Sequence, residues 1–518
     1  MVNFKVLKSG GMSTGSAQGY KRLEEEVQKE VKAGNKVVLV VSAPACEGEK
    51  RDNRVTELLR RKAKGEDTRD RIIGMYESIA TPLGFHFERS ILDDGLMHTQ
   101  REDDILYLGE HAQAWQMNRY LTNRGMNSRW VDARDVLLTS SDFGNGKVLK
   151  VHTQCFNGDT DVFVIGGFYG RDSRGSTVIL PKGGSDLTAD VIAASLHAEE
   201  NVNLKEEPGI RATNPTYVPH AGIIEEMTYR ELRELSYGGN TILQEEAMTW
   251  CRKAKVSMRV RSLLTPEIPG TRIALERDVR KQALVGIAAK PGFVIYSIRR
   301  ENDPQFFQEL FDVFSVRGVS VDMIATENGL VSIAVENKEL SKSTAHDLDS
   351  VLESQYKVRA KGENQALVSV VGEGITGPLT LQERIVQVLD GEVSARYGPI
   401  LGGTVPSTTI YYIERFGMNS EYGIARAVMN SFAQASAPIT GISTTIDSIS
   451  IGTSVHATSQ DIEKMCAHLE ETIQPDTLSV TRNGLQRFGP QRVPSNITVA
   501  VHQEKMERAV QKLYAEFF

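Results

Sequence analysis

The chain is poor in cysteine, and this scarcity excludes several classes of protein. Its four cysteines (Cys46, Cys155, Cys251 and Cys466) are widely scattered over 518 residues and show no C-x-x-C spacing. We therefore expect neither a zinc site nor a disulfide framework. A chain with this cysteine usage is typical of a reducing compartment, so we expect a cytoplasmic protein.

The chain also lacks long hydrophobic runs and clusters of basic residues. No apolar stretch approaches the length that spans a membrane, and the N-terminal residues show no signal-peptide core. The formal net charge is −7, without the basic runs that bind nucleic-acid backbones. The histidines show no metal-ligand spacing. We therefore expect no membrane partner, no nucleic acid and no metal site built from histidines.

Two clusters of glycine, in contrast, stand in loops that each follow a β-prone run. The first reads Lys8-Ser9-Gly10-Gly11-Met12-Ser13, and the second reads Lys182-Gly183-Gly184-Ser185-Asp186. Glycines let the backbone approach a polyphosphate, and a nearby lysine supplies a point charge. Neither loop fits the common nucleotide motifs G-x-x-x-x-G-K-[ST] and G-x-G-x-x-G. The aspartate beside the second loop can either hold Mg²⁺ or orient a lysine, or it can cap the following helix.

From residue 1 to about 285, strand-like and helix-like stretches alternate. Residues 36–42 and 161–167 form apolar runs typical of buried parallel strands, and residues 112–123 are helix-like. This alternation predicts a three-layer α/β domain. Ligands of open α/β sheets bind at the carboxyl ends of the strands, where both glycine loops lie.

The rest of the chain repeats a shorter pattern. A strand at 293–298, a helix at 304–317, strands at 319–322 and 331–335 and a helix at 345–354 form the first unit. A strand at 409–413, a helix at 422–433, a strand at 449–451 and a helix at 459–471 repeat it. Residues 366–374 with a helix at 379–389, and 497–501 with a helix at 503–517, look like two halves of a third unit. Such repetition predicts duplicated modules.

Several motifs together resemble the aspartate kinases of the amino-acid kinase family. Besides the two glycine loops they are Val41-Ser42-Ala43-Pro44, Val55-Thr56-Glu57-Leu58-Leu59, Leu108-Gly109-Glu110, Asp132-Ala133-Arg134-Asp135, Gly167-Phe168-Tyr169-Gly170, Thr228-Tyr229-Arg230-Glu231-Leu232-Arg233-Glu234-Leu235-Ser236-Tyr237-Gly238 and Pro266-Glu267-Ile268-Pro269-Gly270-Thr271. The motifs occur in the family's order over essentially the whole chain. The resemblance implies an α/β fold with a three-layer αβα kinase domain, followed by ferredoxin-like βαββαβ ACT modules.

The resemblance also implies a domain organisation and an activity. The kinase domain would comprise 1–285, one ACT-like module 290–365, a split module 366–405 plus 490–518, and an additional inserted module 406–485. Most relatives have two such modules, so the third suggests an extra effector site or an enlarged interface. The implied reaction is transfer of the γ-phosphoryl group of ATP, with Mg²⁺, to the side-chain carboxylate of aspartate or a close analogue.

The resemblance nominates site residues in four groups. Lys8 and Asp186 would be catalytic, with Lys8 stabilising the transferring phosphoryl group. Ser13, Thr56, Glu110, Lys182 and Ser185 would bind the amino-acid substrate, with Glu110 on its ammonium and Lys182 on a carboxylate. Gly10, Gly11, Gly183, Gly184, Lys205, Glu206 and Gly209 would bind the nucleotide. Ser320, Asp322 and Thr326 would bind an amino-acid effector such as lysine or threonine, although a strand-terminal aspartate can equally be a turn residue.

Two departures from the family pattern leave two interpretations open. Lys182 stands where the family has arginine, which grips a carboxylate with two hydrogen bonds where lysine offers one mobile charge. Lys205 and Glu206 replace a family segment rich in threonine and aspartate. One interpretation is an active kinase with altered preferences, which survival of Lys8, Glu110 and Asp186 favours; the other is a catalytically degenerate amino-acid sensor or regulatory subunit. Pairing of ACT modules across subunits implies a homodimer or larger assembly.

Overall fold

A computed structural model describes most of the chain, and its contacts divide the chain into two compact units. The description covers residues 3–518 except 46–53, 99–100, 238–244, 302–304, 328, 376–377, 390–392, 398–408, 415–426, 429–430, 433–438, 445–447, 454–458, 476, 483–484 and 489–495. The first unit comprises Met1–Ile210, Ile223–Tyr229 and Ile242–Arg277, and the second comprises Arg211–Gly222, Arg230–Thr241 and Asp278–Phe518. Three short segments of the predicted kinase domain therefore group with the second unit, the last being residues 278–285.

The first unit is built on a sheet that is parallel except at one strand. Within the described residues its order is β10-β12-β11-β9-β1-β2-β6-β3, and only the β11–β12 pair is antiparallel. The strands are β1 (Phe4–Ser9), β2 (Lys36–Val41), β3 (Ser128–Val131), β6 (Val162–Gly166), β9 (Glu200–Lys205), β10 (Glu226–Thr228), β11 (Ser257–Ser262) and β12 (Thr271–Ala274). The valine-rich β2 lies in the middle, where both faces are covered.

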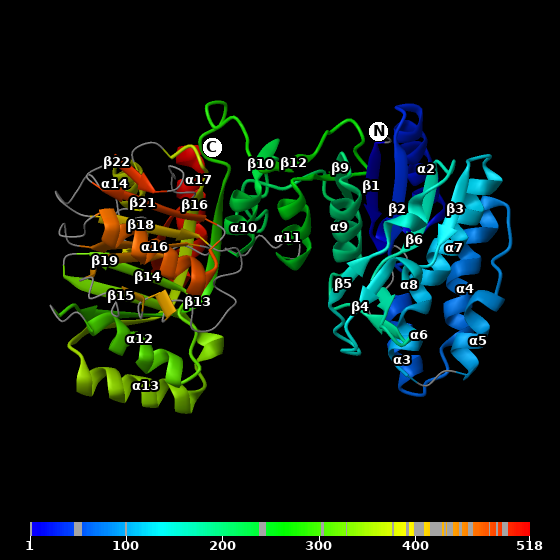
Figure 1. Ribbon diagram of the computed structural model, residues 1–518. Helices are drawn as coiled ribbons and strands as arrows, with labels where there is room; N and C mark the ends of the chain where they lie inside the picture. The colour runs from blue at the N-terminus through cyan, green and yellow to red at the C-terminus, as the bar shows by residue number, and fades with distance from the viewer. Residues whose placement is uncertain are drawn as a thin grey trace. The chain divides into compact units, whose positions relative to one another are not determined.

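Helices cover both faces of this sheet, which confirms the predicted three-layer arrangement (Figure 1). On one face, α2 (Ala17–Lys32), α4 (Arg69–Ala80) and α7 (Leu108–Asn123) share a core with Leu7 and Leu39. On the other face, α9 (Gly184–Leu196) contacts β1 and β9, and α11 (Glu245–Ala254) packs on α9. The remaining α-helices of the first unit are α1 (Gly11–Thr14), α3 (Val55–Ala63), α5 (Ser90–His98), α6 (Asp103–Leu106) and α8 (Ala133–Val136). Helix α10 (Tyr229–Tyr237) belongs to the second unit except for its first residue.

A small second sheet accompanies the large one in the first unit. Its order is β5-β4-β7-β8. The strands are β4 (Leu137–Thr139), β5 (Val148–Val151), β7 (Tyr169–Arg171) and β8 (Thr177–Ile179). β7 and β8 form an antiparallel hairpin that ends just before the second glycine loop. The prediction that this loop follows a strand of the parallel sheet is therefore wrong, because β8 belongs to the small sheet.

The second unit is built on an antiparallel sheet. Within the described residues the order is β17-β23-β16-β13-β15-β14-β19-β20-β18-β21-β22. The strands are β13 (Gly286–Arg299), β14 (Met323–Glu327), β15 (Leu330–Glu336), β16 (Val358–Val371), β17 (Val393–Tyr397), β18 (Thr409–Glu414), β19 (Ile439–Thr444), β20 (Ser448–Thr453), β21 (Thr477–Arg482), β22 (Leu485–Phe488) and β23 (Asn496–His502). The helices are α12 (Phe306–Val316), α13 (Lys342–Gln355), α14 (Pro378–Val388), α16 (Ser459–Ile473) and α17 (Met506–Phe517).

The first module consists of β13, α12, β14, β15, α13 and β16, and its strand order β16-β13-β15-β14 is ferredoxin-like. The strand predicted at 319–322 is wrong, because β14 begins only at Met323. Asp322 precedes the strand because its carboxylate accepts hydrogen bonds from the Tyr237 hydroxyl and from the Glu336 backbone N–H. A short polar side chain that bonds to backbone competes with the strand ladder in this way.

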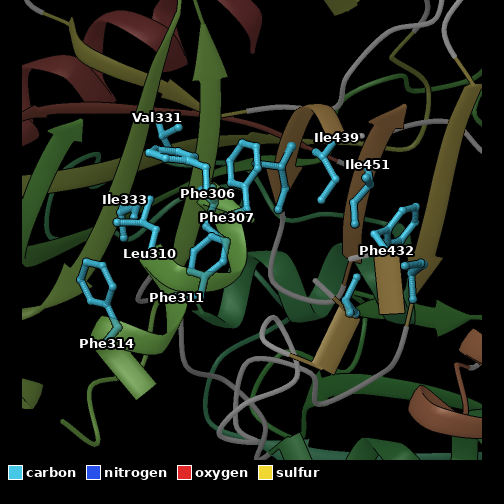
Figure 2. Packing of buried hydrophobic residues seen from close by; sticks show 14 of the residues in the cluster. Phe306, Phe307, Leu310, Phe311, Phe314, Val331, Ile333, Phe432, Ile439 and Ile451 are labelled. Atoms are coloured by element: carbon cyan, nitrogen blue, oxygen red, sulfur yellow. The ribbon is translucent and has the colours of Figure 1, made fainter. Parts of the chain in front are cut away.

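The inserted module consists of β18, β19, β20, α16 and β21, and it repeats the same strand order as β19-β20-β18-β21. Figure 2 shows the apolar cores of both modules, with Phe307, Phe311 and Phe314 of α12 beside β15, and Phe432 with Ile451 in the inserted module. These side chains belong to one buried cluster. The helix expected at 422–433 lies largely outside the described residues.

The split module combines β16, α14, β17, β23 and α17 around the core that contains Val368, Val499 and Leu513. Its fourth strand is the first half of β13, where Gly286 to Pro291 pair with the end of β16. β13 and β16 therefore serve two modules at once. The observed topology confirms the predicted fold class, whereas the exact domain boundaries remain predictions. No helix in the described parts is both long enough and apolar enough to cross a membrane.

Candidate active site

Lys8 lies at the carboxyl end of β1, with its side chain buried toward α9. The β1 strand is central, between β2 and β9, and Lys8 is aligned with Asn203 of β9. Its ammonium nitrogen lies 2.7 Å from Oδ1 of Asp186. The two residues are 178 positions apart in the chain, so the sheet and the helix layer together create this ion pair.

Asp186 occupies the first turn of α9 and does not cap the helix. The N-cap is Gly183, whose φ of 87° is in the left-handed region that favours glycine. The helix-cap interpretation of Asp186 is therefore wrong. The left-handed turn at Gly183 starts the helix early enough for the Asp186 side chain to reach Lys8.

The Asp186 carboxylate is buried among donors and cations. Besides Lys8, the amide of Asn203 donates to Oδ1 over 3.0 Å, and the Lys205 ammonium lies 3.9 Å from Oδ2. Burial alone would raise the pKa of Asp186, but Lys8, Lys205 and the hydrogen bonds hold the pKa below its ordinary value. Burial lowers the pKa of Lys205 despite the nearby Asp186. The two lysines and one carboxylate carry a net positive charge, which suits a phosphate.

The first glycine loop has no room for a side chain at Gly11. A Cβ added there would lie 2.3 Å from the backbone oxygen of Ala43, whereas one added at Gly10 would meet nothing closer than 4.0 Å. Gly11 and Ser13 both lie in the short helix α1. The backbone oxygen of Ser13 packs against Gly19, where an added Cβ would clash with it. The loop is therefore packed directly on the segment that follows β2.

Gly11→Ala is expected to destabilise the protein by about 1–3 kcal/mol, because backbone atoms must shift to admit the methyl group. Urea unfolding measures the effect. Gly10→Ala is the matched control and should change the free energy of unfolding by less than about 1 kcal/mol. Equal effects of the two substitutions would show that the contact at Ala43 is not tight.

The second glycine loop packs against the end of β6. A Cβ on Gly167 would lie 2.7 Å from Cα of Ser185, and one on Gly184 would lie 2.7 Å from Cβ of Leu180. These close approaches fix Ser185 at the start of α9. Lys182 is exposed, so its charged group is available to a ligand.

Glu110 lies in the first turn of α7 and is buried, 5% exposed. Burial raises the pKa of its carboxyl to about 7, although Lys8 and Arg60 contribute opposing positive charge. Within the described residues its Oε2 has no hydrogen-bond partner. A buried carboxyl with a free oxygen is costly to stability, and it is suited to receive a cationic group of a ligand.

Thr56 lies on α3, which packs beside Glu110. A Cβ on Gly109 would contact side-chain atoms of Leu59 and Val55, both on the same helix as Thr56.

On the proposed nucleotide side of the site, Glu206 is exposed directly after β9, and Gly209 is buried against Ile223 and Thr271. The structure therefore brings Lys8, Asp186 and Lys205 together and places the Glu110 carboxylate within the electrostatic influence of Lys8.

The residues predicted to bind an effector lie in the second unit, and two of them already have internal partners. Asp322 accepts from the Tyr237 hydroxyl, and burial raises its pKa to about 6. The Thr326 hydroxyl donates to the oxygen of Ile442 and accepts from its N–H, both over 3.0 Å. Ser320 is half-buried in the turn before β14. Thr326 thus joins the first module to the inserted module.

Asn203 is the site residue that the sequence reasoning missed. The signal for Asn203 in the sequence is a buried asparagine within β9, a strand whose opposite face carries Val202 and Leu204. The sequence does not show that the Asn203 amide bonds to Asp186, because that contact depends on how α9 packs on β9.

Comparison with known proteins shows which chains this one resembles. Residues 3–262 match the model of the amino acid kinase family. Aspartokinase 1, chloroplastic, of Arabidopsis thaliana is 29% identical over 304 residues, which are 55% of this chain and 53% of that protein. The chain therefore spans about half the length of this plant relative.

Solved structures of aspartate kinases share the fold over nearly the whole chain. The aspartate kinase of Clostridium acetobutylicum has a TM-score of 0.65 at 19% identity and covers 99% of this chain and 100% of its own. Aspartokinase III of E. coli, in complex with lysine and aspartate, has a TM-score of 0.57 at 18% identity, covering 99% of each chain. The same enzyme in complex with aspartate and ADP gives 0.52 at 18% identity, covering 91% of this chain and 100% of its own.

Proposed function

The chain belongs to the amino acid kinase family, and we propose that it phosphorylates the side-chain carboxylate of L-aspartate or a close analogue. The phosphoryl donor would be ATP with Mg²⁺, and the products would be an acyl phosphate and ADP. The observation that carries this proposal is the Lys8–Asp186 ion pair, with Lys205 beside it, where the carboxyl end of β1 meets the first turn of α9. The similarity to aspartokinases supports the choice of aspartate.

The geometry supports catalysis by positioning and charge. An oxygen of the substrate carboxylate would attack the γ-phosphorus while the bond to the β–γ bridging oxygen breaks, releasing ADP. The attacking carboxylate is already ionised near neutral pH, so no general base is required. Lys8, held by Asp186, would neutralise charge on the transferring phosphoryl group, and Lys205 would add a second positive charge. Mg²⁺ would arrive with the nucleotide and neutralise phosphate charge.

The substrate would be recognised by opposite charges at its two ends. The unpartnered oxygen of Glu110 suits the substrate ammonium, and the exposed Lys182 suits its α-carboxylate. Ser13, Thr56 and Ser185 would add neutral hydrogen bonds. The glycines of both loops and Gly209 would line the nucleotide, with Glu206 at its rim.

The proposal is tested by incubating the purified protein with Mg·ATP and L-aspartate in the presence of hydroxylamine. Hydroxylamine traps an acyl phosphate as a hydroxamate, which forms a coloured iron complex. Hydroxamate that depends on both substrates is expected. ADP release without hydroxamate would refute a carboxyl acceptor. No turnover, combined with amino-acid binding and no ATP binding, would favour the alternative of a degenerate sensor.

Lys182→Arg is expected to lower the KM for aspartate by about 3–10-fold, because arginine can hold a carboxylate with two parallel hydrogen bonds. The hydroxamate assay at varied aspartate measures this change. The matched control is Lys62→Arg, which makes the same change in the last turn of α3, the helix whose first turn carries Thr56. An unchanged KM in Lys182→Arg would remove this position from substrate recognition.

We also propose that the three ferredoxin-like modules are ACT-like and bind an amino-acid effector; the structure of E. coli aspartokinase III in complex with lysine and aspartate supports an amino-acid ligand of this kind. The proposed residues Asp322 and Thr326 are engaged by Tyr237 and Ile442, so an effector at these residues would have to exchange those hydrogen bonds. A homodimer formed through the modules remains a prediction.

A further inference from the structure

The strand β9 carries amide side chains where a central strand of a parallel sheet usually carries apolar ones. Asn201 and Asn203 are 2% and 3% exposed. They alternate with Val202 and Leu204, which belong to the apolar core on the opposite face. The face of β9 toward α9 is therefore polar where its two asparagines bond to Asp186 and Asp190.

Asn203 and Lys8 donate to the same oxygen of Asp186. The two residues are aligned on adjacent strands, so their side chains approach the first turn of α9 together. The Lys8 nitrogen lies 2.7 Å from Oδ1, and the amide nitrogen of Asn203 lies 3.0 Å from it. The other carboxylate oxygen, Oδ2, lies 3.9 Å from the ammonium nitrogen of Lys205. Two donors on one oxygen restrict rotation of the carboxylate more than a single mobile lysine can.

Stability does not explain an asparagine at this position. Its Oδ1 has no hydrogen-bond partner among the described residues, and burying an unpaired amide oxygen costs free energy. An apolar side chain of similar size would avoid that cost. The benefit must therefore come from the one bond that the amide makes, to Asp186.

We propose that Asn203 is a positioning residue that fixes the Asp186 carboxylate and thereby aims Lys8 at the transferring phosphoryl group. This inference rests on the proposed kinase function for the role of Lys8. When the lysine shifts toward a phosphate, the neutral amide keeps Asp186 in place, because it does not compete for the phosphate charge. Asn203 itself need not touch either substrate.

A matched control lies two residues earlier on the same strand. Asn201 donates to Asp190, one helical turn beyond Asp186 on α9, and not to Asp186 itself. Asp190 also lies 3.7 Å from the thiol sulfur of Cys251. Asn201 and Asn203 thus have the same type, strand, face and burial, but they bond to different carboxyls.

The test compares Asn203→Leu with Asn201→Leu in the full-length protein. NMR of ¹³C-carboxyl-labelled aspartate follows the titration of Asp186, whose signal is assigned by its loss in Asp186→Asn. Asn203→Leu is expected to raise the pKa of Asp186, because a donor to the charged form is lost. It should also lower kcat about tenfold with KM for ATP nearly unchanged, as expected for one hydrogen bond to a charged group. Asn201→Leu should leave the titration of Asp186 close to that of the wild type.

The outcomes separate this inference from the kinase proposal. An unchanged Asp186 titration in Asn203→Leu, or an equal change in Asn201→Leu, would overturn the positioning role. If the wild type forms no hydroxamate, the kinase proposal fails, while the NMR titration still decides whether Asn203 holds Asp186. Thermal unfolding verifies folding of each variant, and Asn203→Ala replaces the leucine variant if that one does not fold.

Discussion

Lys8→Met is expected to lower kcat by about 10²–10³-fold, the usual loss when one preorganised group that stabilises transition-state charge is removed. Methionine keeps the length and most of the volume of the lysine side chain. The substitution leaves Asp186 with Asn203 and Lys205 but without its nearest cation. Initial rates in the hydroxamate assay at saturating ATP and aspartate measure kcat.

The same strand provides a control for Lys8→Met. Lys5 also lies on β1 and forms an ion pair, with Glu30 over 3.1 Å, but three residues earlier and so away from the carboxyl end. Lys5→Met should change kcat by less than about threefold, while its effect on thermal unfolding should be comparable. A Lys8→Met variant that keeps near-wild-type kcat would refute the proposed site. Equal losses in both variants would indicate a structural effect.

The parallel sheet was predictable because its evidence is local. A valine-rich run such as Lys36–Val41 shows the strand, and the change to Ser42-Ala43-Pro44 shows its carboxyl end, all within a few residues. The pairing of Lys8 with Asp186 did not follow from the strand pattern, because the second glycine loop follows β8 of the small sheet and not a strand of the parallel sheet. The family resemblance then supplied their roles as predictions.

The parts that the sequence did not reveal depend on contacts between distant residues. The split module takes its fourth strand from Gly286 to Pro291, far before its other strands, and no local pattern marks half of a long strand as belonging elsewhere. The Tyr237–Asp322 hydrogen bond joins residues 85 apart. The helix-cap interpretation of Asp186 failed because the left-handed backbone of Gly183 moved the start of α9 by several residues.

Glu110→Gln is expected to remove a pH dependence of stability. The pKa of Glu110 is raised from 4.5 to about 7 by burial, so between these pH values the folded protein binds more protons than the unfolded chain. The free energy of unfolding therefore falls as pH rises, by about 3 kcal/mol for this group alone. Urea unfolding at pH 5 and pH 8 measures the difference in the free energy of unfolding between the two pH values. We expect this difference to be smaller in Glu110→Gln than in the wild type by about this amount. An identical difference in the variant would contradict the buried, protonated state.

The same substitution tests substrate recognition, because an ammonium group favours the ionised form of Glu110. In the wild type, KM for aspartate should fall as pH rises toward 7 and level off above it, since binding to the neutral carboxyl requires loss of a proton. Glu110→Gln should raise KM about 10–100-fold at pH 8, as expected for a lost hydrogen bond between charged groups, and should abolish the pH dependence. Glu24→Gln, at a buried glutamate that accepts hydrogen bonds from Gln28 and Arg124, is the control and should leave KM unchanged. A pH dependence that survives in Glu110→Gln would assign the ammonium site to another residue, and the free oxygen of Glu110 would then need a different ligand.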